Sequence, residues 1–115
     1  MDYSCKHIIV ELYGCDKDRT DDIAFAEKIM KEAAEIAGMK NSISHFFKVG
    51  MTGFVIAADA WYGFHSCPEI NYVGLDLYTG NEEIDNEKAL AFLVRKFGAT
   101  KYSASEIKRG NKTEV

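Results

Sequence analysis

The sequence predicts an α+β fold, a two-layer sandwich in which an antiparallel-rich sheet carries two helices on one face. Residues 6–14 alternate with the period of a strand, whereas residues 21–37 place apolar side chains at helical spacing. Further segments rich in Phe, Val, Ile, Tyr and Thr follow, giving the order βαββββαβ. With 115 residues, 47% of them hydrophobic, the chain can bury one core, so we expect a single domain over residues 1–115.

The first predicted strand, residues 6–14, has two unequal faces. Ile8, Val10 and Leu12 share one face, because side chains in a strand alternate between its two sides. Glu11 is therefore predicted to point away from the most apolar side of the strand.

Two helices are predicted, over residues 21–37 and 86–97. Gly38 can end the first, because glycine readily adopts the left-handed conformation that follows a helix. Asp85 can cap the start of the second, and Gly98 can end it. Both helices carry an apolar stripe that would face the sheet.

The remaining predicted elements are strands. Four lie between the helices, over residues 42–49, 51–58, 60–66 and 70–79, and the last spans residues 101–108. The chain has no internal repeat, low-complexity stretch or linker, which agrees with a single domain.

Charge and composition exclude several classes of protein. A net charge of −4 argues against a nucleic acid polymer as partner, since such domains usually present a basic face. No apolar run approaches the roughly 18 residues of a membrane span, and no signal peptide opens the chain, so we expect a cytoplasmic protein without membrane contact. Cys5, Cys15 and Cys67 lack metal-ligand spacing, which predicts reduced thiols and no metal site.

Several segments together resemble a known enzyme family. They are residues 6–16, 50–56, 65–69 (His-Ser-Cys-Pro-Glu), 72–79 (Tyr-Val-Gly-Leu-Asp-Leu-Tyr-Thr) and 107–110. In their order and spacing they resemble the small prokaryotic S-adenosylmethionine (AdoMet) decarboxylases, which use a pyruvoyl cofactor.

The chain departs from this family at the residues that make and use the cofactor. Family members place Glu-Ser-His where this chain has Asp59-Ala60-Trp61, and they cut themselves at the serine to form pyruvoyl. Ala60 has no hydroxyl for that reaction. The family's proton-donating cysteine is replaced by Gly80. The resemblance therefore implies that this chain forms no pyruvoyl, and we expect no cofactor.

The resemblance also implies where AdoMet would bind. By position, Glu11 and His65 are candidates for both binding and catalysis, and Thr52 and His65 would lie near the bond that relatives cut. A sulfonium cation favours aromatic faces and carboxylates. The aromatic candidates for the pocket are Trp61, Tyr62 and Phe64. In a regular strand these three cannot all share one face.

Each candidate has a structural alternative. His65 could be a hydrogen-bonded core histidine, and Glu11 a solvated strand residue. The aromatic residues after Ala60 could serve only in packing.

Two functional interpretations remain at this stage. The first is a cofactor-free lyase that cleaves AdoMet, or a derivative such as a nucleotide conjugate, to methylthioadenosine and a homoserine lactone type product. The second is a pseudoenzyme, a catalytically inactive regulatory partner of an active decarboxylase paralogue in polyamine synthesis. Neither is a pyruvoyl-dependent decarboxylase. For both we expect an AdoMet-related ligand and a homodimer, with a trimer as the alternative.

Overall fold

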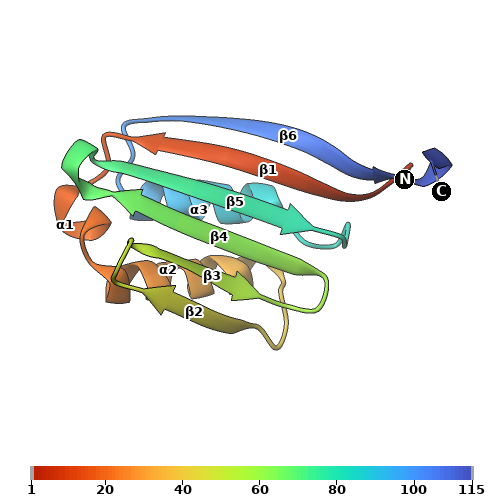
Figure 1. Cartoon of the computed structure of the whole chain (residues 1–115), viewed down its shortest axis with the longest axis horizontal. Helices are drawn as coiled ribbons and strands as arrows, with labels where there is room; N and C mark the ends of the chain where they lie inside the picture. The colour runs from red at the N-terminus through yellow and green to blue at the C-terminus, as the bar shows by residue number, and fades with distance from the viewer. Residues whose placement is uncertain (1, 115) are drawn as a thin grey trace.

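The computed structural model describes residues 2–114, and it consists of one six-stranded sheet with helices on one face (Figure 1). The strands are β1 (Tyr3–Tyr13), β2 (Ile43–Phe47), β3 (Thr52–Ile56), β4 (Ala60–Cys67), β5 (Tyr72–Thr79) and β6 (Lys101–Asn111). The helices are α1 (Lys17–Thr20), α2 (Ile23–Ala37) and α3 (Asn86–Lys96), with 3₁₀ turns at Pro68–Ile70 and Lys112–Glu114. The predicted sandwich and its element order are confirmed.

The sheet order is β2-β3-β4-β5-β1-β6, and each neighbouring pair is antiparallel. The first strand is therefore inserted between β5 and the last strand. This arrangement places residues near the start of the chain beside residues of β5, some 70 positions later in the sequence. It also makes β4, β5 and β1 three adjacent inner strands that could share one binding surface.

The first long helix begins slightly later than predicted. Residues 17–20 form the short helix α1, and the Asp22 side chain accepts a hydrogen bond from the Phe25 N–H at 3.0 Å. This contact makes Asp22 the cap of α2, because it satisfies a backbone donor that the helix leaves free. Gly38 ends α2 with a φ of 101°, as predicted.

The core lies between the sheet and α2 and α3. Along β5 the burial alternates, with Val73, Leu75 and Leu77 almost fully buried. Each such side chain contributes roughly 1.5–3 kcal/mol by leaving water. Along β4 the same alternation buries Tyr62 and Phe64 and turns Trp61 toward the opposite face.

The two terminal strands differ from the prediction in length. Both β1 and β6 run for eleven residues and extend toward the chain ends beyond the other strands (Figure 1). Residues 101–110 of β6 are exposed throughout, so neither side of this edge strand is covered by a helix. Within residues 2–114, no helix is long and apolar enough to cross a membrane.

Candidate functional site

The sheet face opposite the helices, called the open face below, carries the candidate site. Strand pairing arranges its side chains in three rows across β4, β5 and β1. The rows are Trp61, Tyr78 and His7; Gly63, Asp76 and Ile9; and His65, Gly74 and Glu11.

A hollow of about 400 Å³ lies over β3, β4 and β5 on this face. Glycine at position 63 keeps it open: a Cβ there would lie 3.0 Å from the Trp61 ring and 3.5 Å from Asp76 Cβ. The lining residues are Thr52, Gly53, Phe54, Ile56, Trp61, Gly63, Phe64, His65 and Asp76. The volume falls within the usual range for small-molecule pockets.

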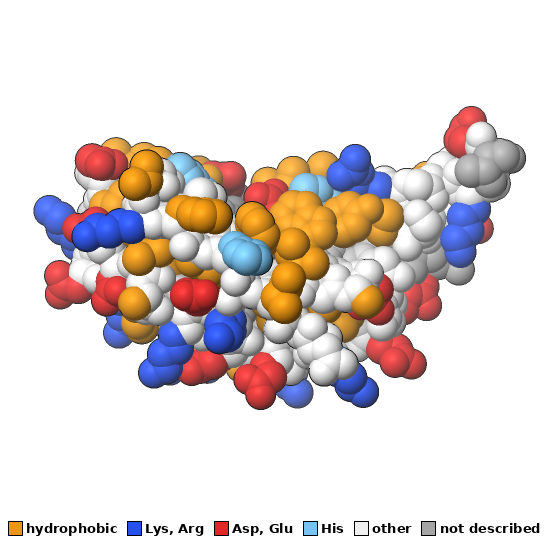
Figure 2. Space-filling view, turned by 60° about the horizontal axis from the view of Figure 1, so that its bottom comes forward, with side chains coloured by type: hydrophobic (Ala, Val, Ile, Leu, Met, Phe, Trp, Pro, Cys, Tyr) orange, Lys and Arg blue, Asp and Glu red, His pale blue; other side chains and the backbone are white. Residues whose placement is uncertain are grey.

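Aromatic rings form one wall of the site. Trp61 stacks on Tyr78, with ring centroids 5.7 Å apart and planes at 13°. The His7 ring meets both edge-on, at 5.8 Å from Trp61 and 5.7 Å from Tyr78. In Figure 2, hydrophobic side chains and pale-blue histidines gather in a band across the upper part of the molecule, and charged side chains predominate below it.

Next to this wall, His7 and Asp76 form a hydrogen-bonded pair. His7 Nε2 donates to Asp76 Oδ1 at 2.9 Å, which makes the ring nitrogen the protonated one when Asp76 is ionised. The His7 side chain is 15% exposed and that of Asp76 is 46% exposed. The pair therefore presents a fixed carboxylate to the hollow.

Glu11 and His65 lie in the third row, on either side of Gly74. The Tyr13 hydroxyl donates to Glu11 Oε2 at 3.4 Å. Burial raises the pKa of Tyr72, and so do a hydrogen bond with Glu11 and that residue's charge. Glu11 is thus engaged by neighbouring tyrosines and is not among the residues that line the hollow.

The structure brings three of the predicted site residues together. Trp61, Thr52 and His65 all line the hollow, and Thr52 pairs directly with His65 across β3 and β4. The Thr52 hydroxyl donates to the Phe64 carbonyl at 3.0 Å, which fixes its orientation.

Tyr62 and Phe64, also predicted to line the ligand pocket, point the other way. Tyr62 is 0% exposed and its hydroxyl donates to Asn86 Oδ1 at 2.6 Å, and the Phe64 ring stacks on Phe97. Because side chains alternate along β4, placing Trp61 on the open face puts both of these on the helix side. Phe64 is nevertheless among the residues that line the hollow.

Ala60, at the start of β4, also faces the helix layer and is 4% exposed. The carbonyl of Asp59 accepts a hydrogen bond from the Gly80 N–H at 2.7 Å. Within this chain His65 lies five residues further along β4, about 17 Å away at the rise of a strand. The family resemblance implies that Thr52 and His65 lie next to the Asp59–Ala60 bond. Within a single chain, these two residues lie far from that bond.

Sequence reasoning did not single out His7 or Asp76 as site residues. The alternation along the first strand places His7 on the same face as Glu11, and this was the available signal. Its contact with Asp76 depends on β1 pairing with β5, which periodicity alone does not specify.

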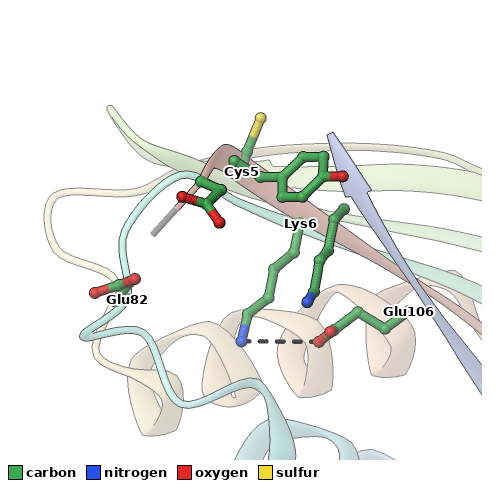
Figure 3. A pocket seen from close by; sticks show the side chains of 7 residues that line it. Cys5, Lys6, Glu82 and Glu106 are labelled. Carbon is green, nitrogen blue, oxygen red and sulfur yellow. Dashed lines mark ion pairs between the residues drawn. The ribbon is translucent and has the colours of Figure 1, made fainter. Parts of the chain in front are cut away.

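A second hollow, of about 530 Å³, lies near the chain ends and is bordered by charged residues (Figure 3). Lys6 reaches toward Glu106, 3.9 Å away, while the Cys5 thiol points to the other side of the strand. Hydrogen bonds with the Ser4 and Tyr78 hydroxyls, and the Arg109 charge, lower the pKa of Cys5. Exposed ion pairs such as Lys6–Glu106 contribute little to stability. No group of three or more metal-ligating side chains occurs among the residues described.

Comparison with known proteins identifies the family. A family model described as S-adenosylmethionine decarboxylase matches residues 6–110. This chain belongs to the S-adenosylmethionine decarboxylase family. It is 38% identical to the S-adenosylmethionine decarboxylase proenzyme of Pyrococcus furiosus, over 99% of this chain and 84% of that protein. It is 40% identical to the Pyrococcus abyssi proenzyme, over 96% of this chain and 81% of that protein.

A solved structure supports the fold assignment. The adenosylmethionine decarboxylase from Aquifex aeolicus superposes with a TM-score of 0.80, covering 96% of this chain and 93% of that one. The two sequences are 23% identical, so this likeness concerns the fold alone.

The relatives also correct the functional interpretations drawn from the sequence. They are named as decarboxylase proenzymes, and this chain matches them over most of their length. The cofactor-free lyase and the inactive regulatory partner are therefore wrong, as is the expectation of an activity other than pyruvoyl-dependent decarboxylation. The resemblance to the AdoMet decarboxylase family is confirmed.

Proposed function

We propose that this protein binds AdoMet over the open face of the sheet and serves in AdoMet decarboxylation. The observation that carries the proposal is the family match over residues 6–110, together with 38–40% identity to decarboxylase proenzymes. The hollow beside Trp61 supplies a surface of suitable size for the ligand.

The hollow suits the two chemical parts of AdoMet. Its aromatic and apolar lining can contact the flat adenine, and a cation over a ring gains roughly 0.5–2 kcal/mol. His65 and Thr52, at the other end of the hollow, offer polar groups to the ligand's hydroxyl and carboxylate oxygens. These side chains would bind and orient the substrate, and the sheet behind them would exclude water from one side.

A pyruvoyl group formed at residue 60 does not fit this chain. The side chain of Ala60 is a buried methyl group without an oxygen atom. Thr79, directly across the sheet from Ala60, uses its hydroxyl to donate to the Asn81 carbonyl at 3.0 Å. Decarboxylation leaves an electron pair on the α-carbon that requires an electron sink. A keto group at residue 60 cannot be that electron sink, because the Ala60 side chain has no oxygen atom from which to form it.

Release of carbon dioxide tests the function directly. We expect carboxyl-labelled AdoMet to release labelled carbon dioxide when it is incubated with the purified protein. AdoMet incubated without the protein is the control, and a rate above that control is required. Absence of any such increase would overturn the proposal.

The state of the backbone can be measured independently. Because Ala60 lacks a hydroxyl, we expect one intact polypeptide of about 12.9 kDa without a terminal keto acid. Ala60→Ser restores the missing oxygen and is the matched comparison. Two fragments from the unaltered chain, with the break after Asp59, would contradict the expectation.

We further propose that the protein is a homodimer. The open face holds exposed and half-buried apolar side chains, and β6 is an uncovered edge strand, both of which favour association of copies. Light scattering at micromolar concentration should give a mass near twice 12.9 kDa. A monomer would refute this proposal, whereas a trimer would replace the dimer by the alternative assembly.

A further inference from the structure

Asp76 is a carboxylate in the middle of an otherwise aromatic and apolar part of the open face. It lies on β5, between Gly63 of β4 and Ile9 of β1, and lines the hollow beside Trp61. Its side chain is 46% exposed, so the charge is partly removed from water without being buried. A charge in such a setting interacts more strongly with a ligand than one on an open surface.

One oxygen of this carboxylate is held in place. His7 Nε2 donates to Oδ1 at 2.9 Å, and the His7 ring is itself positioned by edge-on contacts with Trp61 and Tyr78. Among the side-chain hydrogen bonds of residues 2–114, the one that reaches the Asp76 carboxylate is to Oδ1, and none is to Oδ2. Asp76 therefore has one oriented oxygen and one that is free to contact a ligand.

No lysine or arginine among the described residues forms an ion pair with Asp76. Its partner is His7, whose ring is a cation only when protonated, and the other pairs are Lys6–Glu106 and Arg19–Asp16. Arg109 lies over the Tyr78 ring, 5.7 Å from its centroid, and forms no ion pair with Asp76. The hollow consequently combines an aromatic wall with one negative charge, an arrangement that favours an organic cation.

We propose that Asp76, oriented by His7, is the anionic partner of a positively charged ligand in this hollow. For AdoMet, that partner is the sulfonium. The inference rests on the proposed function for the identity of the ligand, and it assigns to Asp76 the distinction between a sulfonium and a neutral thioether. His7 is a positioning residue that acts through Asp76.

The matched pair of probes is AdoMet and S-adenosylhomocysteine, which differ in the methyl group that makes the sulfur cationic. By calorimetry we expect the unaltered protein to bind AdoMet at least about tenfold more tightly, the effect of a charge-assisted contact. Asp76→Asn should reduce this preference to less than about threefold, mainly by weakening the binding of AdoMet. Asp18→Asn, at an exposed aspartate on α1, is the control and should leave the preference unchanged.

His7 variants separate positioning from general damage. His7→Ala should lower the preference for AdoMet, whereas His7→Gln, which keeps an N–H donor, should retain more of it. A purely structural role would weaken both probes equally and leave their ratio unaltered. If Asp76→Asn does not fold by circular dichroism, Asp76→Glu is measured instead, and it must keep a preference for the cation because it keeps the charge.

The possible failures are distinguishable. If the unaltered protein prefers AdoMet but Asp76→Asn retains that preference, the role of Asp76 is refuted and the proposed function stands. If the unaltered protein binds both probes equally, the hollow does not select a cation, and the inference is overturned. If it binds neither probe, the proposed function and the inference both fail.

Discussion

Trp61 and Tyr62 are adjacent aromatic residues of β4 with opposite environments. Tyr62 is 0% exposed and donates its hydroxyl to Asn86, while burial, followed by the charge of Asp85, raises its pKa. Trp61 lies over Gly63 on the open face and lines the hollow. The face of the strand, and not the residue type, therefore separates a residue that stabilises the fold from one available to a ligand.

The comparison is tested most strongly by removing the buried ring. Tyr62→Ala should lower the free energy of unfolding by about 3–5 kcal/mol, because a large cavity would remain in the core. Trp61→Ala is the neighbouring control and should cost clearly less. Urea denaturation measures both, and equal losses would contradict the assignment of the two faces.

A smaller loss of folding stability is expected at high pH from Cys15, which is buried in the core. Burial, and secondarily the charge of Asp16, raises the pKa of Cys15 from its ordinary 9.0 to about 11. Above pH 9 the unfolded thiol ionises while the folded one stays protonated, so stability falls between pH 9 and about 11. The upper limit of this loss is about 3 kcal/mol, at about 1.4 kcal/mol for each pKa unit.

Cys15→Ala is the variant that isolates this effect. Its unfolding free energy should decline less steeply than that of the unaltered protein between pH 9 and 11. The half-buried thiol Cys5, whose pKa is lowered, changes stability in the opposite sense and is present in both proteins. Parallel pH profiles for the two proteins would show that Cys15 does not titrate as described.

On the open face, the loss should appear in binding. Trp61→Ala should weaken AdoMet by about 0.5–2 kcal/mol, the range for a cation over an aromatic ring. Trp61 is the one tryptophan of the chain, so its fluorescence should also change when AdoMet binds. Tight binding with unaltered emission would indicate that the ligand occupies another part of the surface.

The smallest effect is expected at Glu11. It remains a predicted ligand-binding and catalytic residue, but it lies outside the hollow and is engaged by Tyr13 and Tyr72. Glu11→Gln should therefore weaken AdoMet by less than about 1 kcal/mol, near the value of one ordinary hydrogen bond. If Glu11→Gln weakens AdoMet binding more than Asp76→Asn does in the same titration, the charged part of the ligand lies beside the third row, at Glu11.

Local patterns were sufficient to predict the order of the elements. Alternation along the first strand placed Glu11 opposite Val10 and Leu12, and the structure agrees. The sequence does not single out Asp22 as the capping residue of α2, because Thr20 and Asp21 also have suitable side chains.

The site was less accessible to such reasoning. His7 and Asp76 are separated by 69 residues, and strand pairing alone brings them within hydrogen-bonding distance. The choice between Trp61 and Tyr62 required knowing which face of β4 the helices cover. A family resemblance supplied Glu11 and His65 by position, but it could not indicate which of the two borders a hollow.

Gly63 gives the hollow an unusual sensitivity to a single atom. The methyl group of an alanine there would press on the Trp61 ring at 3.0 Å, so the ring would have to shift by a few tenths of an ångström, away from its present position beside Asp76. Neither the strand pairing nor the core on the other side of β4 depends on the position of the Trp61 ring. Replacing Gly63 by alanine would therefore change which ligands fit the hollow while the fold remains the same.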